Sequence, residues 1–240
     1  RNFNLSNYTT IKVGGIAEYF AEPSTFYEFA NLIKWSQLNN QECQIIGAGL
    51  NLLINNIFLK GLIICTKKMR RLKIDQTTGI VEAEAGVMLP TLSNSLAKKG
   101  LQGGEWAIGI PGTLGGAIVM NAGSKDISLA KNLISVKVID TKTLEVFEIE
   151  KKDINFKYRY SPFQNNNLLI VSAKLYFEPR GNIKELIHKT KYKLEIKRKA
   201  QPYHLPSFGS VFKNPKNEYA AKLIEEIGLK GYKVGGAEIS

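Results

Sequence analysis

The chain has 240 residues, of which 44% are hydrophobic and 22% charged, a composition that is ordinary for a globular protein and argues against disorder. Its net charge of +12 favours anionic partners such as nucleic acid, anionic lipid or phosphorylated small molecules. The two cysteines form no Cys-x-x-Cys pair, the two histidines are too sparse for a metal site, and no apolar run is long enough to cross a bilayer.

The first part of the chain alternates strands with one helix. Residues 18–21, 44–46 and 62–65 are short segments that predict strands, and the last of them is wholly apolar. Thr25 and Glu28 have the spacing of a capping box, and apolar residues recur near the helical period after them. A helix is therefore expected to continue to about residue 37.

After Thr66 the pattern changes. Residues 80–85 alternate apolar and polar side chains like a half-buried strand, and residues 89–99 predict a helix that ends before Gly100. The remaining expected elements are strands at 135–140, 145–149 and 168–177, a basic helix at 182–200 and a last helix at 220–227. Because strands and helices are mixed without regular βαβ alternation, the sequence predicts an α+β fold with at least two sheets.

Residues 47–53 read Gly-Ala-Gly-Leu-Asn-Leu-Leu and follow a predicted strand. Small residues let a backbone pass close to a phosphate, whose oxygens free N–H groups can then bind. The segment is not a Rossmann fingerprint, because Leu52 stands where the third glycine belongs. The alternative is a tight turn with glycines at positive φ.

Eight of the 21 glycines lie between Gly100 and Gly123. Ordering so many glycines costs backbone entropy, so a packed domain usually carries them where a flat or phosphorylated ligand presses on the backbone. An isoalloxazine ring and a pyrophosphate are such ligands. The alternative is a glycine-rich pair of turns.

Two further segments are candidates for catalysis. Arg159 lies between Tyr158 and Tyr160, where its guanidinium could clamp a carboxylate or an enolate, or form a structural ion pair, for example with Asp153. Ser210 lies in a polar loop at residues 206–215, beside a glycine. Its hydroxyl could donate a proton to a reacting carbon, or serve only as a turn or capping group.

Together, and in this order, these four segments resemble the MurB family of FAD-dependent UDP-N-acetylenolpyruvoylglucosamine reductases. Residues 8–15 and 221–236 are also similar to family signatures, so the resemblance covers nearly the whole chain. The short stretch after Ser161 resembles the class without a Tyr-bearing loop insertion. The sequence departs from the family at Ser124-Lys125-Asp126, where an aromatic–Gly pair is usual, and it ends at Ser240 without a counterpart of a catalytic Glu.

The resemblance implies an α+β fold with two FAD-binding subdomains of the vanillyl-alcohol-oxidase/PCMH type, at residues 1–66 and 67–177. A smaller α+β substrate-binding domain follows at residues 178–240, and the missing Glu implies that this domain is C-terminally incomplete. The implied activity is transfer of a hydride from NADPH to FAD, and then from flavin N5 to C3 of the enolpyruvyl group of UDP-N-acetylglucosamine enolpyruvate (UDP-GlcNAc-enolpyruvate). Protonation at C2 gives UDP-N-acetylmuramate for peptidoglycan synthesis.

The same resemblance implies specific site residues. Arg159 would stabilise the enolate, Ser210 would protonate C2, and Tyr158, Lys213 and Asn214 would contact the substrate. The cofactor-binding residues that it implies are Tyr8, Thr9, Gly47, Ala48, Gly49, Leu50, Asn51, Leu52, Gly109, Ile110, Pro111, Gly112, Thr113, Gly115, Gly116, Ala117, Asn121, Ala122 and Gly123.

We expect a cytoplasmic monomer that acts on small molecules, with no metal, no nucleic-acid partner and no membrane insertion. Two other functions stay open at this point. One is a different FAD-dependent oxidoreductase of the same superfamily, such as an oxidase of a small alcohol. The other is a basic protein that binds nucleic acid.

Overall fold

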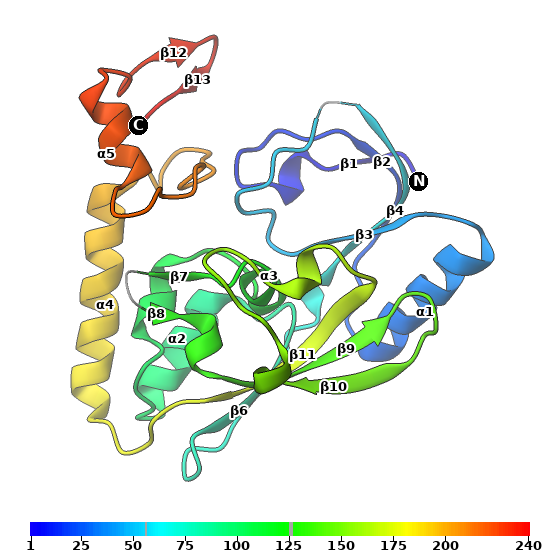
Figure 1. The fold of residues 1–240 in the computed structure, drawn as a ribbon, viewed down its shortest axis with the longest axis horizontal. Helices are drawn as coiled ribbons and strands as arrows, with labels where there is room; N and C mark the ends of the chain where they lie inside the picture. Colours follow the sequence, from blue (N-terminus) through cyan, green and yellow to red (C-terminus); the bar gives the residue numbers. More distant parts are fainter. Residues whose placement is uncertain (56, 125–126) are drawn as a thin grey trace.

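The computed structural model describes residues 1–55, 57–124 and 127–240. These residues form a four-stranded sheet, a five-stranded sheet, two short hairpins and five α-helices (Figure 1). The strands are β1 (Phe3–Asn4), β2 (Ile16–Ala21), β3 (Cys43–Ile46), β4 (Phe58–Cys65), β5 (Leu72–Ile74), β6 (Ile80–Glu84), β7 (Gly123–Ser124), β8 (Ile127–Ser128), β9 (Leu133–Asp140), β10 (Val146–Glu150), β11 (Leu168–Tyr176), β12 (Lys233–Val234) and β13 (Ala237–Glu238). The helices are α1 (Phe26–Leu38), α2 (Leu89–Lys98), α3 (Leu114–Val119), α4 (Ile183–Ala200) and α5 (Ala220–Glu226).

The first sheet has the strand order β1-β2-β4-β3. β4 is parallel to both of its neighbours, whereas β1 is antiparallel to β2. The run Leu62–Cys65 is buried on both faces, which explains why it is continuously apolar rather than alternating. Leu62 and Ile64 pack against α1, and Ile63 and Cys65 pack on the opposite face against the N-terminal segment.

The predicted start of α1 is confirmed. Thr25 caps the helix, and its side chain accepts a hydrogen bond from the amide of Glu28. The carboxylate of Glu28 reaches back one residue further than a capping box requires, and it accepts bonds from the amide and hydroxyl of Ser24. These bonds satisfy amide groups that a helix start would otherwise leave unpaired.

The second sheet is antiparallel throughout and has the order β10-β9-β11-β6-β5. One face packs against α2 and α3 in the largest apolar core, which includes Leu92, Ile118 and Leu175. On the other face, Ile139 and Val171 join the cluster around α1. Helix α1 therefore contacts both sheets and holds them together.

Helix α3 lies inside the glycine-rich segment and has no counterpart among the expected elements. Its six residues include two glycines, which are poor helix formers. The helix is nevertheless stabilised from outside, because Leu114 and Ile118 are fully buried in the core of the second sheet. Thr113 caps its start by accepting a bond from the amide of Gly116.

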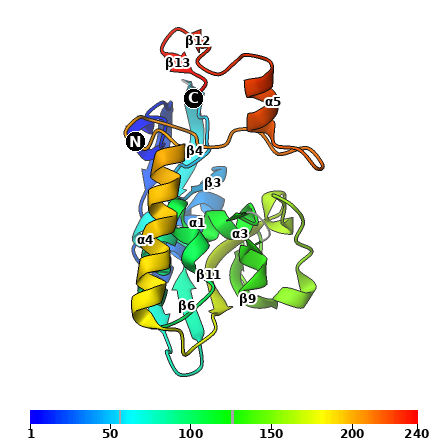
Figure 2. The same cartoon turned by 90° about the vertical axis from the view of Figure 1, so that its left-hand side faces the viewer.

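The C-terminal segment, residues 201–240, follows α4. Helix α4 packs against α2 and the short 3-10 helix Glu105–Gly109, and its Leu186 and Thr190 are buried. The hairpin β12–β13 and α5 stand beyond its end, apart from both sheets (Figures 1 and 2). Most side chains of the C-terminal segment are exposed. Among the described residues, no helix is both long enough and apolar enough to cross a membrane.

Candidate active site

The two glycine-rich segments meet in space, although one follows β3 and the other begins at the end of the 3-10 helix Glu105–Gly109. A Cβ atom added to Gly47 would lie only 2.2 Å from the hydroxyl oxygen of Thr113. A Cβ atom at Gly112 would lie 3.7 Å from the side chain of Leu50. The fold thus brings residues 47–53 and 109–123 against one another, although about 60 residues separate them in the chain.

The backbone of the N-terminal segment packs directly against the first glycine-rich loop. Gly49 has a φ of +65°, and a Cβ there would come within 1.9 Å of the carbonyl oxygen of Tyr8. The amide of Thr10 donates a hydrogen bond of 3.1 Å to the carbonyl of Gly49. Both the backbone conformation and the lack of space require glycine at this position.

The side chains of Tyr8 and Thr9, which the sequence placed at the cofactor, make contacts within the protein. The Tyr8 hydroxyl donates a 2.9 Å bond to Glu22, and the Thr9 hydroxyl donates a 2.7 Å bond to the carbonyl of Val13. Burial, followed by the bond to Glu22, raises the pKa of Tyr8 to about 12. These bonds hold the N-terminal segment in place, and its backbone at Tyr8 and Thr10 contacts Gly49.

The glycines of the second segment do not adopt the left-handed backbone conformation that favours glycine in tight turns. None of the glycines from Gly109 to Gly123 has a positive φ, and in the first segment Gly49 does but Gly47 does not. The alternative explanation, a tight turn that requires glycine at positive φ, therefore applies only to Gly49 in these two segments.

The residues fit FAD on two observations. First, none of the amides from Ala48 to Asn51, nor those of Gly112 and Thr113, donates to a backbone carbonyl of the described residues. Such amides suit the oxygens of a pyrophosphate. Second, a Cβ at Gly112 or Gly116 would meet nothing closer than 3.5 Å, so packing within the chain does not require glycine there. Bare backbone at these positions lets a flat or phosphorylated group approach closely.

Arg159 is held against the end of the second glycine-rich segment. Its guanidinium donates to the carbonyls of Asn121 at 3.4 Å and Gly123 at 3.2 Å, and it lies 5.3 Å from the centre of the Tyr158 ring. Arg159 itself has a φ of +53°, in a tight turn at residues 157–160. Among the described residues no salt bridge joins Arg159 to Asp153, the carboxylate considered as an example of a structural partner.

Two residues that the sequence did not single out in these roles keep this turn in place. The amide side chain of Gln164 donates to the carbonyl of Arg159 at 3.1 Å and to that of Val119 at 3.2 Å. The side-chain amide of Asn121, expected at the cofactor, donates a 3.0 Å bond to the carbonyl of Lys157. A glutamine in a loop gives no sequence signal, because its partners are backbone carbonyls and one of them, that of Val119, lies 45 residues away in the chain.

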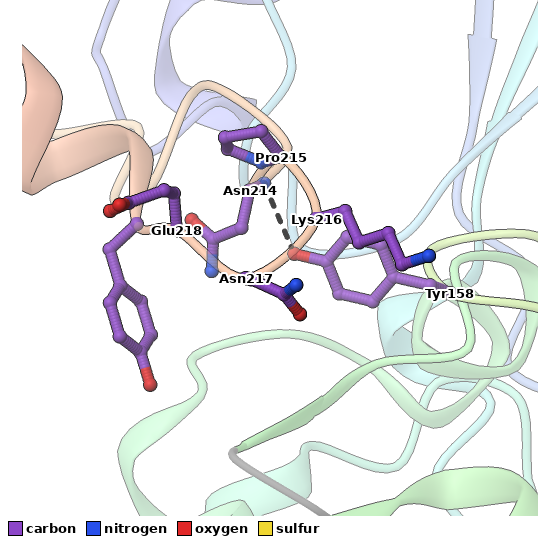
Figure 3. A pocket seen from close by; sticks show the side chains of 7 residues that line it. Tyr158, Asn214, Pro215, Lys216, Asn217 and Glu218 are labelled. Atoms are coloured by element: carbon purple, nitrogen blue, oxygen red, sulfur yellow. Dashed lines mark hydrogen bonds between the residues drawn. The ribbon is translucent and has the colours of Figure 1, made fainter.

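The loop with Ser210 is joined at its two ends to the rest of the site. Near its start, the amide of Ser207 donates to the carbonyl of Thr10 at 3.2 Å. Near its end, the amide of Asn214 donates to the hydroxyl of Tyr158 at 3.3 Å (Figure 3). Ser210 lies between these two anchors and is exposed.

An open cavity of about 520 Å³ lies where this loop faces Tyr158, and Tyr158 and residues 214–219 line it (Figure 3). Of the predicted substrate contacts, Tyr158 and Asn214 therefore come together. Lys213 is exposed and does not line the cavity, whereas Lys216, three residues on, does. Lys125 and Asp126, at the expected departure from the family pattern, lie outside the described residues.

Comparison with known proteins agrees with this geometry. Residues 17–148 match the family model of an FAD binding domain, and residues 201–240 match that of the UDP-N-acetylenolpyruvoylglucosamine reductase C-terminal domain. A UDP-N-acetylenolpyruvoylglucosamine reductase of Prochlorococcus marinus subsp. pastoris is 73% identical over 99% of this chain and 80% of the relative. A second Prochlorococcus marinus reductase is 46% identical over 100% of this chain and 82% of its own length.

A solved structure is similar as well. The crystal structure of UDP-N-acetylenolpyruvylglucosamine reductase (MurB) from Thermus caldophilus has a TM-score of 0.81 and 30% identity, and the match covers 99% of this chain and 83% of that one. The similarity thus extends over sequence, both matched domains and the fold. This chain belongs to the UDP-N-acetylenolpyruvoylglucosamine reductase family.

Proposed function

We propose that this chain reduces UDP-N-acetylglucosamine enolpyruvate to UDP-N-acetylmuramate, a step of peptidoglycan synthesis, with NADPH as the reductant. The observation that carries the proposal is the meeting of the two glycine-rich segments with Arg159 at the edge of one of them. When bound, FAD supplies the hydride chemistry, taking a hydride from NADPH and giving one to C3 of the enolpyruvyl group.

The chain binds FAD mainly through backbone. The amides of residues 48–51, Gly112 and Thr113 are the candidates for the pyrophosphate, because none of them donates to a described backbone carbonyl. Gly112 and Gly116 leave bare backbone for close approach. Tyr8 and Thr9, which belong to the same proposed cofactor site, are held in place by their own hydrogen bonds to Glu22 and Val13.

Arg159 stabilises the negative charge that hydride addition pushes into the substrate carboxyl group. A cation fixed in advance is effective here, because it does not have to reorganise when the charge develops. The carbonyls of Asn121 and Gly123 hold the guanidinium in one orientation, and the Tyr158 ring lies beside it. Its remaining donors can grip a carboxylate.

Ser210 donates the proton to C2. Its loop is tied to the N-terminal segment at Ser207 and to Tyr158 at Asn214, and these two anchors hold the loop beside the residue next to Arg159. A positioned acid of this kind contributes a factor on the order of 10²–10⁴ in rate. Tyr158, Asn214 and Lys213 bind the substrate, and Lys216 joins them because it lines the cavity together with Tyr158 and Asn214.

The same proposal includes the organisation of the chain. Residues 1–66 and 67–177 form the two FAD-binding subdomains, each with its own sheet, and residues 178–240 belong to the substrate-binding domain. The protein works in the cytoplasm as a monomer on small molecules, without nucleic acid. The basic charge suits a UDP-sugar and NADPH, which are both anionic.

Changing Ser210→Ala tests the proposal by separating the two half-reactions. Flavin bleaching by NADPH should be unchanged, since that step needs no proton at C2, and reoxidation by the enolpyruvyl substrate should slow by a factor on the order of 10²–10⁴. Stopped-flow absorbance measures both. Ser207→Ala is the matched control, because it alters the same loop but leaves the Ser210 hydroxyl.

Three results would count against the proposal. A protein that cannot be reconstituted with FAD would exclude the flavin site. Normal turnover by Ser210→Ala would make Ser210 a simple loop residue. Reduction of the flavin by a small alcohol, without reoxidation by the enolpyruvyl sugar nucleotide, would indicate a different oxidoreductase of the superfamily.

A further inference from the structure

Within the described residues, three hydrogen bonds join the C-terminal segment to the rest of the chain, and each reaches a different part of the site. Ser207 bonds to Thr10 and Asn214 bonds to Tyr158, as described above. The third is the shortest, at 2.8 Å, and runs from the hydroxyl of Tyr203 to the carbonyl of Gly109. It is the one to which the C-terminal segment contributes a side chain.

The acceptor of this bond is the first residue of the second glycine-rich segment. Gly109 is buried and ends a short 3-10 helix, Glu105–Gly109. The stem of Lys197, near the end of α4, lies across the same glycine, since a Cβ added there would be 2.7 Å from the Cγ of that lysine. The end of α4 and the turn after it therefore contact Gly109 together.

We propose that Tyr203 is a positioning residue that couples the seating of the C-terminal segment to the binding of FAD at residues 109–123. This inference rests on the proposed function. If FAD binding and the seating of the C-terminal segment share one contact, each favours the other by the same factor in its equilibrium constant. FAD that orders residues 109–123 therefore also stabilises the seated position of the segment that carries Ser210. Tyr203 works through the Gly109 carbonyl and does not touch the substrate.

A purely structural role would give a different result. In that case the hydroxyl would add a little to overall stability, and its loss would weaken the protein to the same extent with and without FAD. Partial burial raises the pKa of Tyr203, so the phenol remains neutral and able to donate at neutral pH. A coupling role predicts instead that the effect of FAD on the C-terminal segment depends on this hydroxyl.

The experiment compares wild type, Tyr203→Phe and Tyr232→Phe, each with and without FAD. Hydrogen–deuterium exchange at residues 201–215 is the readout, with the buried amides of β11 as an internal reference for global stability. Tyr232 is the matched control, because it is an exposed tyrosine of the same segment. FAD titration of the three proteins gives the dissociation constants.

In wild type and Tyr232→Phe, FAD should slow exchange at residues 201–215. In Tyr203→Phe this protection should shrink, and the FAD dissociation constant should rise by about two- to ten-fold, the effect of losing one hydrogen bond. Exchange without FAD should also be faster at these residues than in wild type, while exchange in β11 stays the same.

Equal protection by FAD in wild type and Tyr203→Phe would overturn the inference and leave the proposed function standing. If wild type bound no FAD, the proposed function would fail. The Tyr203 contact would then be judged by exchange without FAD, where faster exchange in Tyr203→Phe supports the anchoring bond and equal exchange refutes it.

Discussion

Thr113 packs where a side chain at Gly47 would lie, and replacing Gly47 by alanine tests this contact between the two glycine-rich segments directly. Gly47 does not have a positive φ, so its backbone accepts alanine without strain. The whole cost of Gly47→Ala therefore comes from the new methyl group, which would lie 2.2 Å from the Thr113 hydroxyl and 3.3 Å from its Cβ. Thr113 is buried and caps α3, so it cannot simply turn away.

The expected magnitude follows from these contacts. Forcing one methyl group into a packed site costs about 1–3 kcal/mol. Thr113→Ala alone should cost about 1 kcal/mol, the usual loss for a helix cap. In the double variant the hydroxyl that the new methyl meets is gone, so the two costs should not add. We expect the double variant to be about 1–2 kcal/mol more stable than the sum of the single variants, since contacting residues couple by this much.

Urea unfolding of wild type, Gly47→Ala, Thr113→Ala and the double variant measures the free energies of this double-mutant cycle. FAD titration of the same four proteins accompanies it. Weaker FAD binding in Gly47→Ala and its partial recovery in the double variant would place the contact inside the cofactor site. Costs that add to within about 0.5 kcal/mol would show that the two residues do not touch. That result would refute the convergence of the two segments on which the site is built.

Two further predictions concern other parts of the site. Arg159→Lys should keep FAD bound but slow substrate reduction measurably. Lysine keeps the charge but loses the planar fork that donates to the carbonyls of Asn121 and Gly123 and that, in the proposed function, grips the substrate carboxylate. Equal rates would show that a point charge is sufficient. Tyr8→Phe should cost about 1 kcal/mol at neutral pH through the lost bond to Glu22. Because folding raises the pKa of Tyr8 from 10.0 to about 12, this contribution is complete below pH 10 and disappears as pH rises toward 12, which urea unfolding at neutral and at high pH would detect. A cost that does not change with pH would contradict the assigned pKa.

The sequence by itself determined the local elements and the order of the motifs. Thr25 and Glu28 located the start of α1, because a capping bond spans only three residues. The apolar run at Leu62–Cys65 located the most buried strand of the first sheet. The family resemblance followed from residue types at fixed spacing, which are visible without any coordinates.

Tertiary structure alone decided which of these pieces touch. Helix α3 forms because Leu114 and Ile118 enter a core built by strands far away in the sequence, against the preference of its glycines. Position 49 requires glycine because the carbonyl oxygen of Tyr8 leaves no space for a Cβ atom, whereas Gly112 has room for a side chain. Lys216 rather than Lys213 lines the cavity beside Tyr158. Local patterns depend on neighbours within a few residues, but the space around an atom depends on segments brought together by folding, and a sequence read in order does not contain those distances.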